Sequence, residues 1–266
     1  MTRRLEASQN RRHLVIPDTQ LRPGVATEHI DWAAQAIVDY KPDVIVVIGD
    51  WWDMPSLSTH EQPGSIHTEG NRIRDDIAFG NEAYGRLVKP LRTEQKRLIA
   101  GRRKAWTPEE HFLMGNHEFR INRAVSTAPK FEDVLSTDDL DTQGFTRHEF
   151  LEIVEIDGIS YSHYFSNVHS GRPIGGSIDN RLNKIGNSFV QGHQQGLLYG
   201  IKPFPGSGPR AQRHGLVAGS FYLHDEHYRD AQSNGEWRGI VVLNDVENGD
   251  YDVMPLSNKY LRFRYG

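Results

Sequence analysis

Apolar runs in the first half of the chain alternate with helical patterns. Residues 13–16 and 44–48 are predicted strands, and the second is a continuous apolar run typical of a strand covered on both faces. Between them, apolar residues recur at helical spacing from Thr27, the predicted N-cap, to Tyr40. Strand, helix and strand in this order form a βαβ unit, so we expect parallel strands with ligand-binding loops at their carboxyl ends.

The next segment is predicted to contain a loop, a long helix and a further strand. Residues 54–70 are rich in Ser, Pro, Gly and His, and a mostly polar helical pattern then runs over residues 73–99. Pro90 lies inside this helix and should kink or split it. A strand is predicted at residues 111–114, followed by helical segments around residues 120–126 and 131–135.

The second half of the chain favours strands. Residues 150–156 and 159–163 flank Asp157-Gly158, which is a strong two-residue hairpin signal. Further strands are predicted at residues 188–191, 215–218, 239–243 and 251–254, with a turn at residues 247–250. We therefore expect one α/β domain over residues 1–266, with residues 1–12 as an N-terminal tail.

Composition narrows the classes of protein that fit. Hydrophobic residues make up 37% and charged residues 25% of the chain, which is typical of a soluble globular protein. No segment approaches the roughly 20 apolar residues of a membrane span, and we see no signal peptide, so we expect a cytoplasmic location without a membrane partner. Zero cysteines leave any metal to oxygen and imidazole ligands. The net charge of -4 weighs against non-specific duplex binding but not against a local phosphate site.

Short polar clusters follow the predicted strands and carry the candidate chemistry. They are Asp18-Thr19-Gln20, Gly49-Asp50-Trp51-Trp52-Asp53, Gly115-Asn116-His117-Glu118, His163 and Gly192-His193-Gln194-Gln195. Acidic residues that directly follow buried strands point into the crevice above a sheet. Carboxylates, an amide and imidazoles gathered there can hold two divalent cations and supply a proton donor, which is the equipment for breaking phosphate esters.

The order of these clusters resembles the motifs of the calcineurin-like metallophosphoesterases, in particular the phage-encoded type. The family pattern is D-x-H, G-D-x-x-D, G-N-H-[ED], a single His and G-H-x-H. The matching residues lie between positions 13 and 220 and are Asp18, Gly49-Asp50, Asp53, Gly115-Asn116-His117-Glu118, His163 and Gly192-His193. The resemblance implies a four-layer metallophosphoesterase sandwich, with two mixed β-sheets flanked by helices, and a location in the host cytoplasm.

The resemblance also implies a ligand set for two divalent metal ions. Asp18 would bind one ion, Asp50 would bridge both, and the second ion would be held by Asn116, His163 and His193. Two close cations lower the pKa of a water held between them, so that a bridging hydroxide can attack phosphorus near neutral pH.

Two residues of the central motifs are expected to take part in proton transfer. The resemblance implies that His117 protonates the leaving group and that Asp53 orients the imidazole of His117. Glu118 is expected to be a structural hydrogen-bond acceptor rather than a catalyst.

Two departures from the family pattern fall on the same metal position. Gln20 and Gln195 stand where the family has histidines. With Asp18 and Asp50 they would form an all-oxygen site that favours hard ions over zinc and binds more weakly. Mn²⁺ is the favoured cofactor, and Mg²⁺, Ca²⁺ and Zn²⁺ stay open. Alternatively, Gln20 is a polar loop residue and the ion of this glutamine-bearing position is absent.

Other residues have a substrate-binding and a structural interpretation. Trp51 and Trp52 could stack a base or a sugar at the mouth of the site, or they could be packing anchors. Arg120 is a candidate phosphate clamp. The loop with His224, Asp225 and His227 could border the crevice or be a solvated loop.

Together these patterns predict a hydrolase of phosphate esters. A nucleotide or nucleic-acid diester is preferred slightly over a monoester. A phosphoprotein or small-molecule phosphatase would share the same chemistry, and a binding protein with an impaired metal site is the alternative from another class.

Overall fold

The six-stranded sheet of the protein is built around the predicted βαβ unit. The computed structural model describes residues 11–59, 70–204, 211–225 and 235–266. Strand β1 (Arg11–Ile16) pairs in parallel with β2 (Val44–Val47), and α1 (Glu28–Tyr40) connects them, as predicted. The strand begins at Arg11, within the expected N-terminal tail, and residues 1–10 lie outside the described residues. The Thr27 side chain makes no bond to the helix N-terminus; its hydroxyl accepts a hydrogen bond from Arg86 at 2.8 Å instead.

Two parallel and two antiparallel strands complete this sheet. Strands β3 (Glu109–Leu113) and β4 (Thr146–His148) continue the parallel part, while β10 (Gly239–Glu247) and β11 (Asp250–Ser257) add an antiparallel hairpin. The strand order is β11-β10-β1-β2-β3-β4. The central parallel strands therefore bring their carboxyl ends, and the loops that follow, to one edge.

The second sheet has five strands in the order β5-β6-β7-β9-β8. These strands are β5 (Val154–Ile156), β6 (Ile159–Ser162), β7 (Ser188–Gln191), β8 (Leu197–Pro203) and β9 (Gln212–Ala218). The predicted hairpin is confirmed, because Ile156 pairs with Ile159 around a turn in which Asp157 and Gly158 both have positive φ. Both sheets are mixed, as expected.

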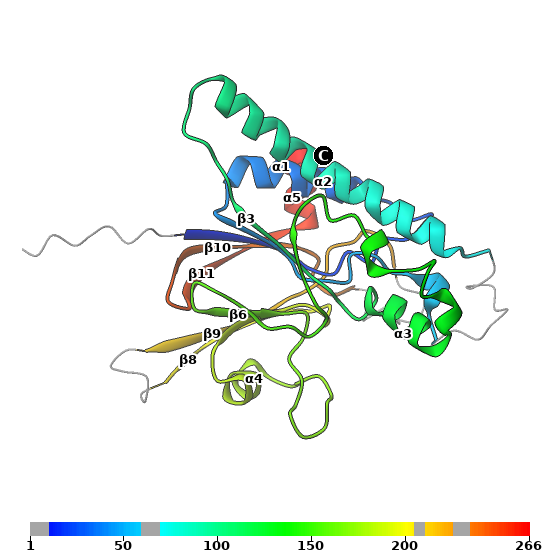
Figure 1. The fold of residues 1–266 in the computed structure, drawn as a ribbon. Helices are drawn as coiled ribbons and strands as arrows, with labels where there is room; N and C mark the ends of the chain where they lie inside the picture. Colours follow the sequence, from blue (N-terminus) through cyan, green and yellow to red (C-terminus); the bar gives the residue numbers. More distant parts are fainter. Residues whose placement is uncertain (1–10, 60–69, 205–210, 226–234) are drawn as a thin grey trace, which may run out of the picture.

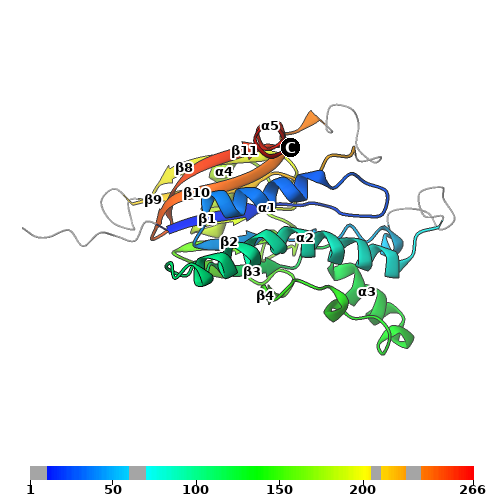
Figure 2. The same cartoon turned by 90° about the horizontal axis from the view of Figure 1, so that it is seen from above.

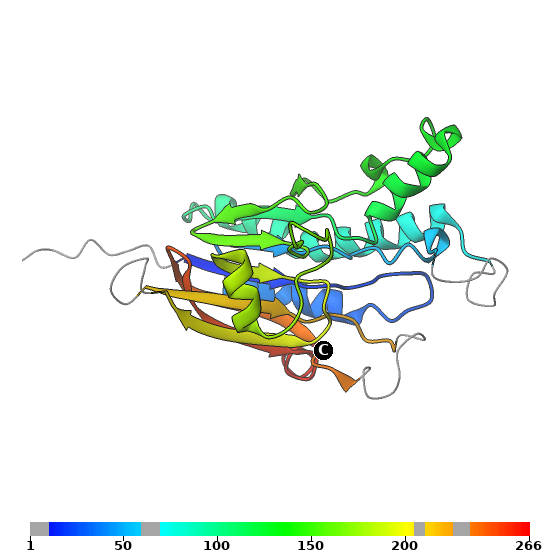
Figure 3. The same cartoon turned by 90° about the horizontal axis from the view of Figure 1, so that it is seen from below.

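Helices cover the outer faces of the two sheets. Figure 1 shows α1, α2 (Ile73–Ala100) and α5 (Asn258–Tyr265) on the side of the six-stranded sheet, and α4 (Ile178–Ile185) on the side of the other sheet. Figure 2 looks down on α1 and α2, and Figure 3 shows α4 from the opposite side. The remaining α-helix, α3 (Phe119–Thr127), directly follows the loop after β3. No helix among the described residues has the length and apolar character of a membrane span.

Of the kink or split expected at Pro90, the split is wrong. Helix α2 runs through Pro90 as one helix of 28 residues. Leu87, Val88 and Leu91 flank the proline and are buried in the core beneath the helix. Tertiary packing of this apolar stripe holds the helix together at a position where the proline removes a backbone hydrogen bond.

Other local expectations also need correction. Residues 131–135 form no helix beyond the 3₁₀ turn Pro129–Phe131, and residues 150–153 lie outside the hairpin. Most of the predicted loop at 54–70 falls on residues 60–69, outside the described part, but Pro55–Leu57 form a 3₁₀ turn. A third such turn spans Thr137–Asp139.

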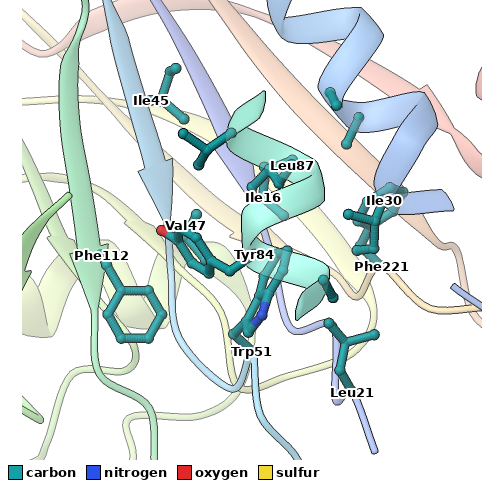
Figure 4. Packing of buried hydrophobic residues seen from close by; sticks show 14 of the residues in the cluster. Ile16, Leu21, Ile30, Ile45, Val47, Trp51, Tyr84, Leu87, Phe112 and Phe221 are labelled. Carbon is teal, nitrogen blue, oxygen red and sulfur yellow. The ribbon is translucent and has the colours of Figure 1, made fainter. Parts of the chain in front are cut away.

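The apolar core is divided by the two sheets. One cluster fills the space between the sheets and includes Val15, Val46, Leu113, Tyr161, Val190 and Leu216. A larger cluster lies between the six-stranded sheet and the helices, where Figure 4 shows Tyr84 and Leu87 of α2 packed over Val47 and Phe112. The strands that carry the polar clusters are thus fixed by packing on both faces.

Candidate metal centre

The polar clusters predicted at strand ends meet in the structure. Asp18 follows β1, Asp50 follows β2, and Asn116 follows β3, while His163 and His193 follow β6 and β7 of the other sheet. Asp50 and His193 both have positive φ, at 50° and 64°. Non-glycine residues rarely adopt this conformation, and such strain clusters at functional sites.

Glycines before the candidate ligands allow this close approach. A Cβ atom on Gly115 would lie 2.1 Å from Oδ1 of Asp50. Gly49 has a φ of +96°, and a Cβ there would lie 2.7 Å from the backbone nitrogen of Gly115. The β2 and β3 ends could not come together with larger residues at these positions.

The histidine side of the centre consists of Asp50, Asn116, His163 and His193. Ligand atoms of Asp50, His163 and His193 all lie within 4.8 Å of one another. Oδ1 of Asn116 is 3.0 Å from Nε2 of His163 and 2.8 Å from Nδ1 of His193. These distances require protons on both ring nitrogens or a cation between the four groups. Imidazole, carboxylate and amide donors fit a divalent transition-metal ion such as Mn²⁺ or Zn²⁺.

The electrostatics around His163 also favour a cation. Burial opposes the charged ring, but Asp50 and then Asp18 raise the pKa of His163 to about 10. Nδ1 of His163 donates to the carbonyl of Ile48 at 2.9 Å, which leaves Nε2 to face Asp50 at 3.3 Å. Burial, followed by the neighbouring His163, lowers the pKa of His193 to about 4, so His193 is a neutral ring suited to a metal.

The glutamine side consists of Asp18, Gln20 and Gln195. Asp18 is fully buried, and its Oδ1 accepts the backbone N–H of His193 at 3.0 Å. Its Oδ2 has no hydrogen-bond partner among the described residues. Burial raises the pKa of Asp18 to about 7, with His163 opposing and Asp50 adding to the rise. A buried carboxylate oxygen without a partner is a position that a cation would satisfy.

The two glutamines bond to each other and to a tyrosine. Nε2 of Gln195 donates to Oε1 of Gln20 at 3.4 Å, and Oε1 of Gln195 accepts from the hydroxyl of Tyr222 at 2.6 Å. Both amide oxygens thus accept hydrogen bonds from protein donors. Ligation of a metal by Gln20 and Gln195 stays a prediction, and it would require these bonds to be exchanged for a cation.

His117 and Asp53 lie together, as the predicted proton-handling pair requires. Nδ1 of His117 is 2.9 Å from Oδ1 of Asp53, and Nε2 is 3.7 Å from Oδ2 of Asp50. Burial opposes a charge on His117, but Asp50 and Asp53 raise its pKa overall. Burial likewise opposes the Asp53 carboxylate, but its contacts with His117, Arg22 and Arg120 lower the pKa to about 2. Asp53 is therefore ionised and can support an imidazolium.

Arg22 is a partner of this pair that sequence reasoning missed. Its Nη1 donates to Oδ2 of Asp53 at 2.7 Å. Nothing in the sequence pattern distinguishes Arg22 from the other arginines, because the contact depends on how the loop after β1 lies against the loop after β2.

Arg120 is not placed as the predicted phosphate clamp. Its side chain is buried, and Nη1 donates to the carbonyls of Asp53 and Met54 at 2.7 and 3.2 Å. Nη2 is 3.1 Å from Nε2 of His117. The guanidinium therefore braces the loop after β2 and the imidazole of His117.

Glu118 is a structural hydrogen-bond acceptor, as predicted. Oε2 accepts the backbone N–H groups of Asp50 and Gly115 at 3.0 and 2.8 Å, and Oε1 accepts that of Trp52 at 3.0 Å. The side chain is fully buried. It ties the loop after β2 to the loop after β3 beneath the metal donors.

The substrate-stacking role considered for Trp51 and Trp52 is wrong. Both side chains are fully buried, and their indole N–H groups donate to the α2 carbonyls of Gly80 and Ile77. Figure 4 shows Trp51 packed beneath Tyr84, and the Trp52 ring stacks on Tyr84 at 6.0 Å. The motif turns both rings into the core, so they are packing anchors.

His224 lies beside the glutamine side rather than among the metal donors. Its ring stacks on Tyr222 at 4.7 Å, and Tyr222 bonds to Gln195. Asp225 of the same loop pairs with Arg238 at 3.2 Å. His227 lies outside the described residues.

The described cavities do not coincide with the metal donors. One of about 520 Å³ is lined by residues of α2 and the following turns, including Ile73, Ile77 and Phe131. Another of about 390 Å³ lies near Arg213 and Asp250. The chemistry of the donor set marks the candidate site.

No family model matches the chain, and no curated protein matches it either.

Proposed function

We propose that this protein is a metal-dependent phosphoesterase. The observation that carries the proposal is the meeting of Asp50, Asn116, His163 and His193 around one point, with His117 beside them. These donors come from strand ends in both sheets, so the fold itself assembles the centre. A protonatable residue that sits beside the donors without belonging to their cluster is what ester cleavage needs in addition to a metal.

The layered architecture supports the same proposal. Two packed sheets with helices outside agree with the metallophosphoesterase sandwich that the motifs suggest. We propose that the chain has this fold and that the five motif positions carry their family roles, apart from the two glutamines.

The two sides of the centre would hold metal differently. Asp50, Asn116, His163 and His193 would hold one ion, and Asp18 with Asp50 would hold a second, weaker one. When bound, divalent ions lower the pKa of a coordinated water and stabilise charge on a phosphate. The Ile48 carbonyl accepts the Nδ1 proton of His163, so Nε2 faces Asp50 and would be the atom that binds an ion.

His117 would deliver the proton to the leaving oxygen. Its Nδ1 is held by Asp53, and its Nε2 lies on the side of Asp50. Asp50 and Asp53 raise its pKa against burial and against Arg120, so the ring carries a proton at a higher pH than an isolated histidine. A proton on Nε2 would replace the hydrogen bond that the neutral ring accepts there from Arg120. Arg22 and Arg120 keep Asp53 ionised and in place.

Hydrolysis of an aryl phosphodiester in the presence of Mn²⁺ tests the proposal. Asp50→Asn and His117→Ala should each lower the rate by at least about 100-fold, the lower end of the effect of losing a general acid. Asp39→Asn is the matched control, because Asp39 bonds to Arg264 and Tyr265 on the outer helices. If Asp50→Asn keeps the wild-type rate, the proposed centre is wrong.

The hydrogen bond between Gln20 and Gln195 favours one alternative function. The protein would then bind a ligand without hydrolysing it, because one metal position is impaired. Gln20 and Gln195 satisfy each other where a second ion would need ligands. A wild-type protein that binds Mn²⁺ but hydrolyses neither phosphodiesters nor monoesters, across several metals, would support this alternative.

A further inference from the structure

A strip of aromatic rings leads from the metal donors to α3. Tyr164 directly follows His163, and its ring centroid is 4.7 Å from that of His193. Phe150 meets Tyr164 edge to face at 5.6 Å, and Phe119, the first residue of α3, stacks on Phe150 at 4.8 Å. We refer to Phe119, Phe150 and Tyr164 as the aromatic strip.

The aromatic strip differs from the aromatic residues of the core. Each of its residues is partly exposed, whereas Trp51 and Trp52 are fully buried. Phe150 also packs against the large core cluster. Tyr164 belongs to none of the apolar clusters of described residues, and its hydroxyl makes no hydrogen bond to them. The fold does not use this ring for packing in the way it uses the tryptophans.

Ring contacts place Tyr164 between the metal donors and α3, because its ring meets that of His193 on one side and that of Phe150, which stacks on Phe119, on the other. Arg123 of α3 is close enough to Tyr164 to act electrostatically on its hydroxyl group. Arg123 is exposed. A ligand whose phosphate lies at the metal donors could therefore place a ring on the strip beside a cationic side chain.

We propose that the aromatic strip binds an aromatic ring of the phosphate ester, namely a nucleobase or an aryl group. The inference rests on the proposed function, since it assumes that the phosphate lies at the metal donors. Stacking on an aromatic side chain is tolerant of the base involved, so the strip would select nucleotide or aryl esters as a class over alkyl esters.

Binding of two small phosphates in the presence of Mn²⁺ tests this inference. Adenosine 5′-monophosphate and ribose 5-phosphate share the phosphate and sugar but differ in the base. Calorimetry should show that wild-type protein binds the nucleotide about tenfold or more tightly. Tyr164→Leu should bring this affinity ratio toward one, whereas Tyr164→Phe should retain it.

Phe263→Leu is the matched control, because Phe263 is 89% exposed on α5. It should leave the affinity ratio unchanged. An equal affinity for both phosphates in the wild type, or a ratio that Tyr164→Leu does not change, overturns the inference even if the protein hydrolyses esters. Conversely, a base preference that depends on Tyr164 in a protein without hydrolytic activity would leave the inference standing and reject the proposed function.

Discussion

The histidine side and the glutamine side of the centre share Asp50 but differ in how their polar groups are satisfied. On the histidine side, two imidazoles and a carboxylate crowd around one amide oxygen, and the arrangement needs a cation or several protons. On the glutamine side, the two amides bond to each other and to Tyr222. Oδ2 of Asp18 is a buried atom there without a partner among the described residues.

This difference shows that a metal position depends on competing hydrogen bonds as well as on the presence of ligand atoms. A neutral amide can complete its hydrogen bonds within the protein, and binding a metal must then break them. An imidazole whose other nitrogen is held by a carbonyl is oriented so that its remaining nitrogen can bind a metal once it loses its proton. We therefore expect unequal metal affinities on the two sides.

The largest expected effect comes from removing one donor on each side in turn. His163→Ala should weaken binding of the first Mn²⁺ by at least about 100-fold, because loss of even an outer partner of a ligand costs 10–100-fold. Gln195→Ala should weaken it by less than about tenfold. Calorimetric Mn²⁺ titration of the two variants measures both effects, and equal losses would break the comparison.

A pH titration of stability sharpens the electrostatic part of the comparison. His29 on α1 is buried like His163, but burial followed by His224 and Arg86 lowers its pKa from 6.5 to about 3. The folded protein holds His29 neutral, so below about pH 6.5 the unfolded chain binds the extra proton and stability falls. The loss should be about 1.4 kcal/mol per pH unit until the pH reaches about 3.

The variant His29→Leu should remove this part of the pH dependence. Relative to it, wild-type protein should lose about 2 to 3 kcal/mol of unfolding free energy between pH 6.5 and 4.5, measured by urea denaturation. His169→Leu, at an exposed loop position, is the control and should keep the wild-type slope. Parallel curves for His29→Leu and wild type would show that His29 takes up its proton in the folded state.

The smallest expected change is a gain on the glutamine side. The double variant Gln20→His with Gln195→His should raise the affinity of the second ion by about tenfold or more, because imidazoles replace weak amide ligands. It also removes the acceptor of the Tyr222 hydroxyl, at a cost of about 1 to 3 kcal/mol in stability. An unchanged Mn²⁺ titration in a folded double variant would mean that the glutamines do not limit this position.

The parts of the fold that the sequence predicted are those with strong local signals. A continuous apolar run predicted β2, and the Asp157-Gly158 turn predicted the β5–β6 hairpin. Helices α4 and α5 and strands β4 and β8 were missed. α4 is short and polar, and β8 is an edge strand with exposed Leu198 and Ile201, so neither carries a clear apolar period.

At the site, residue types predicted the donors but not the orientation of their neighbours. Asp18, Asp50, Asn116, His163 and His193 meet because strand ends share an edge. The sequence did not predict the side-chain directions of the tryptophans and Arg120. These directions are set by packing against α2 and by hydrogen bonds to carbonyls of the loop after β2. Tyr164 was missed although it adjoins His163, because a single aromatic residue has no distinguishing pattern.

Metal stoichiometry of the wild-type protein tests the central claim most directly. Elemental analysis after purification, followed by Mn²⁺ titration of the metal-free protein, separates tight from weak ions. The account predicts one tightly bound ion per chain and a second that is filled only at high Mn²⁺ concentration. Two equally tight ions per chain, for example two zinc ions that survive purification, would contradict it.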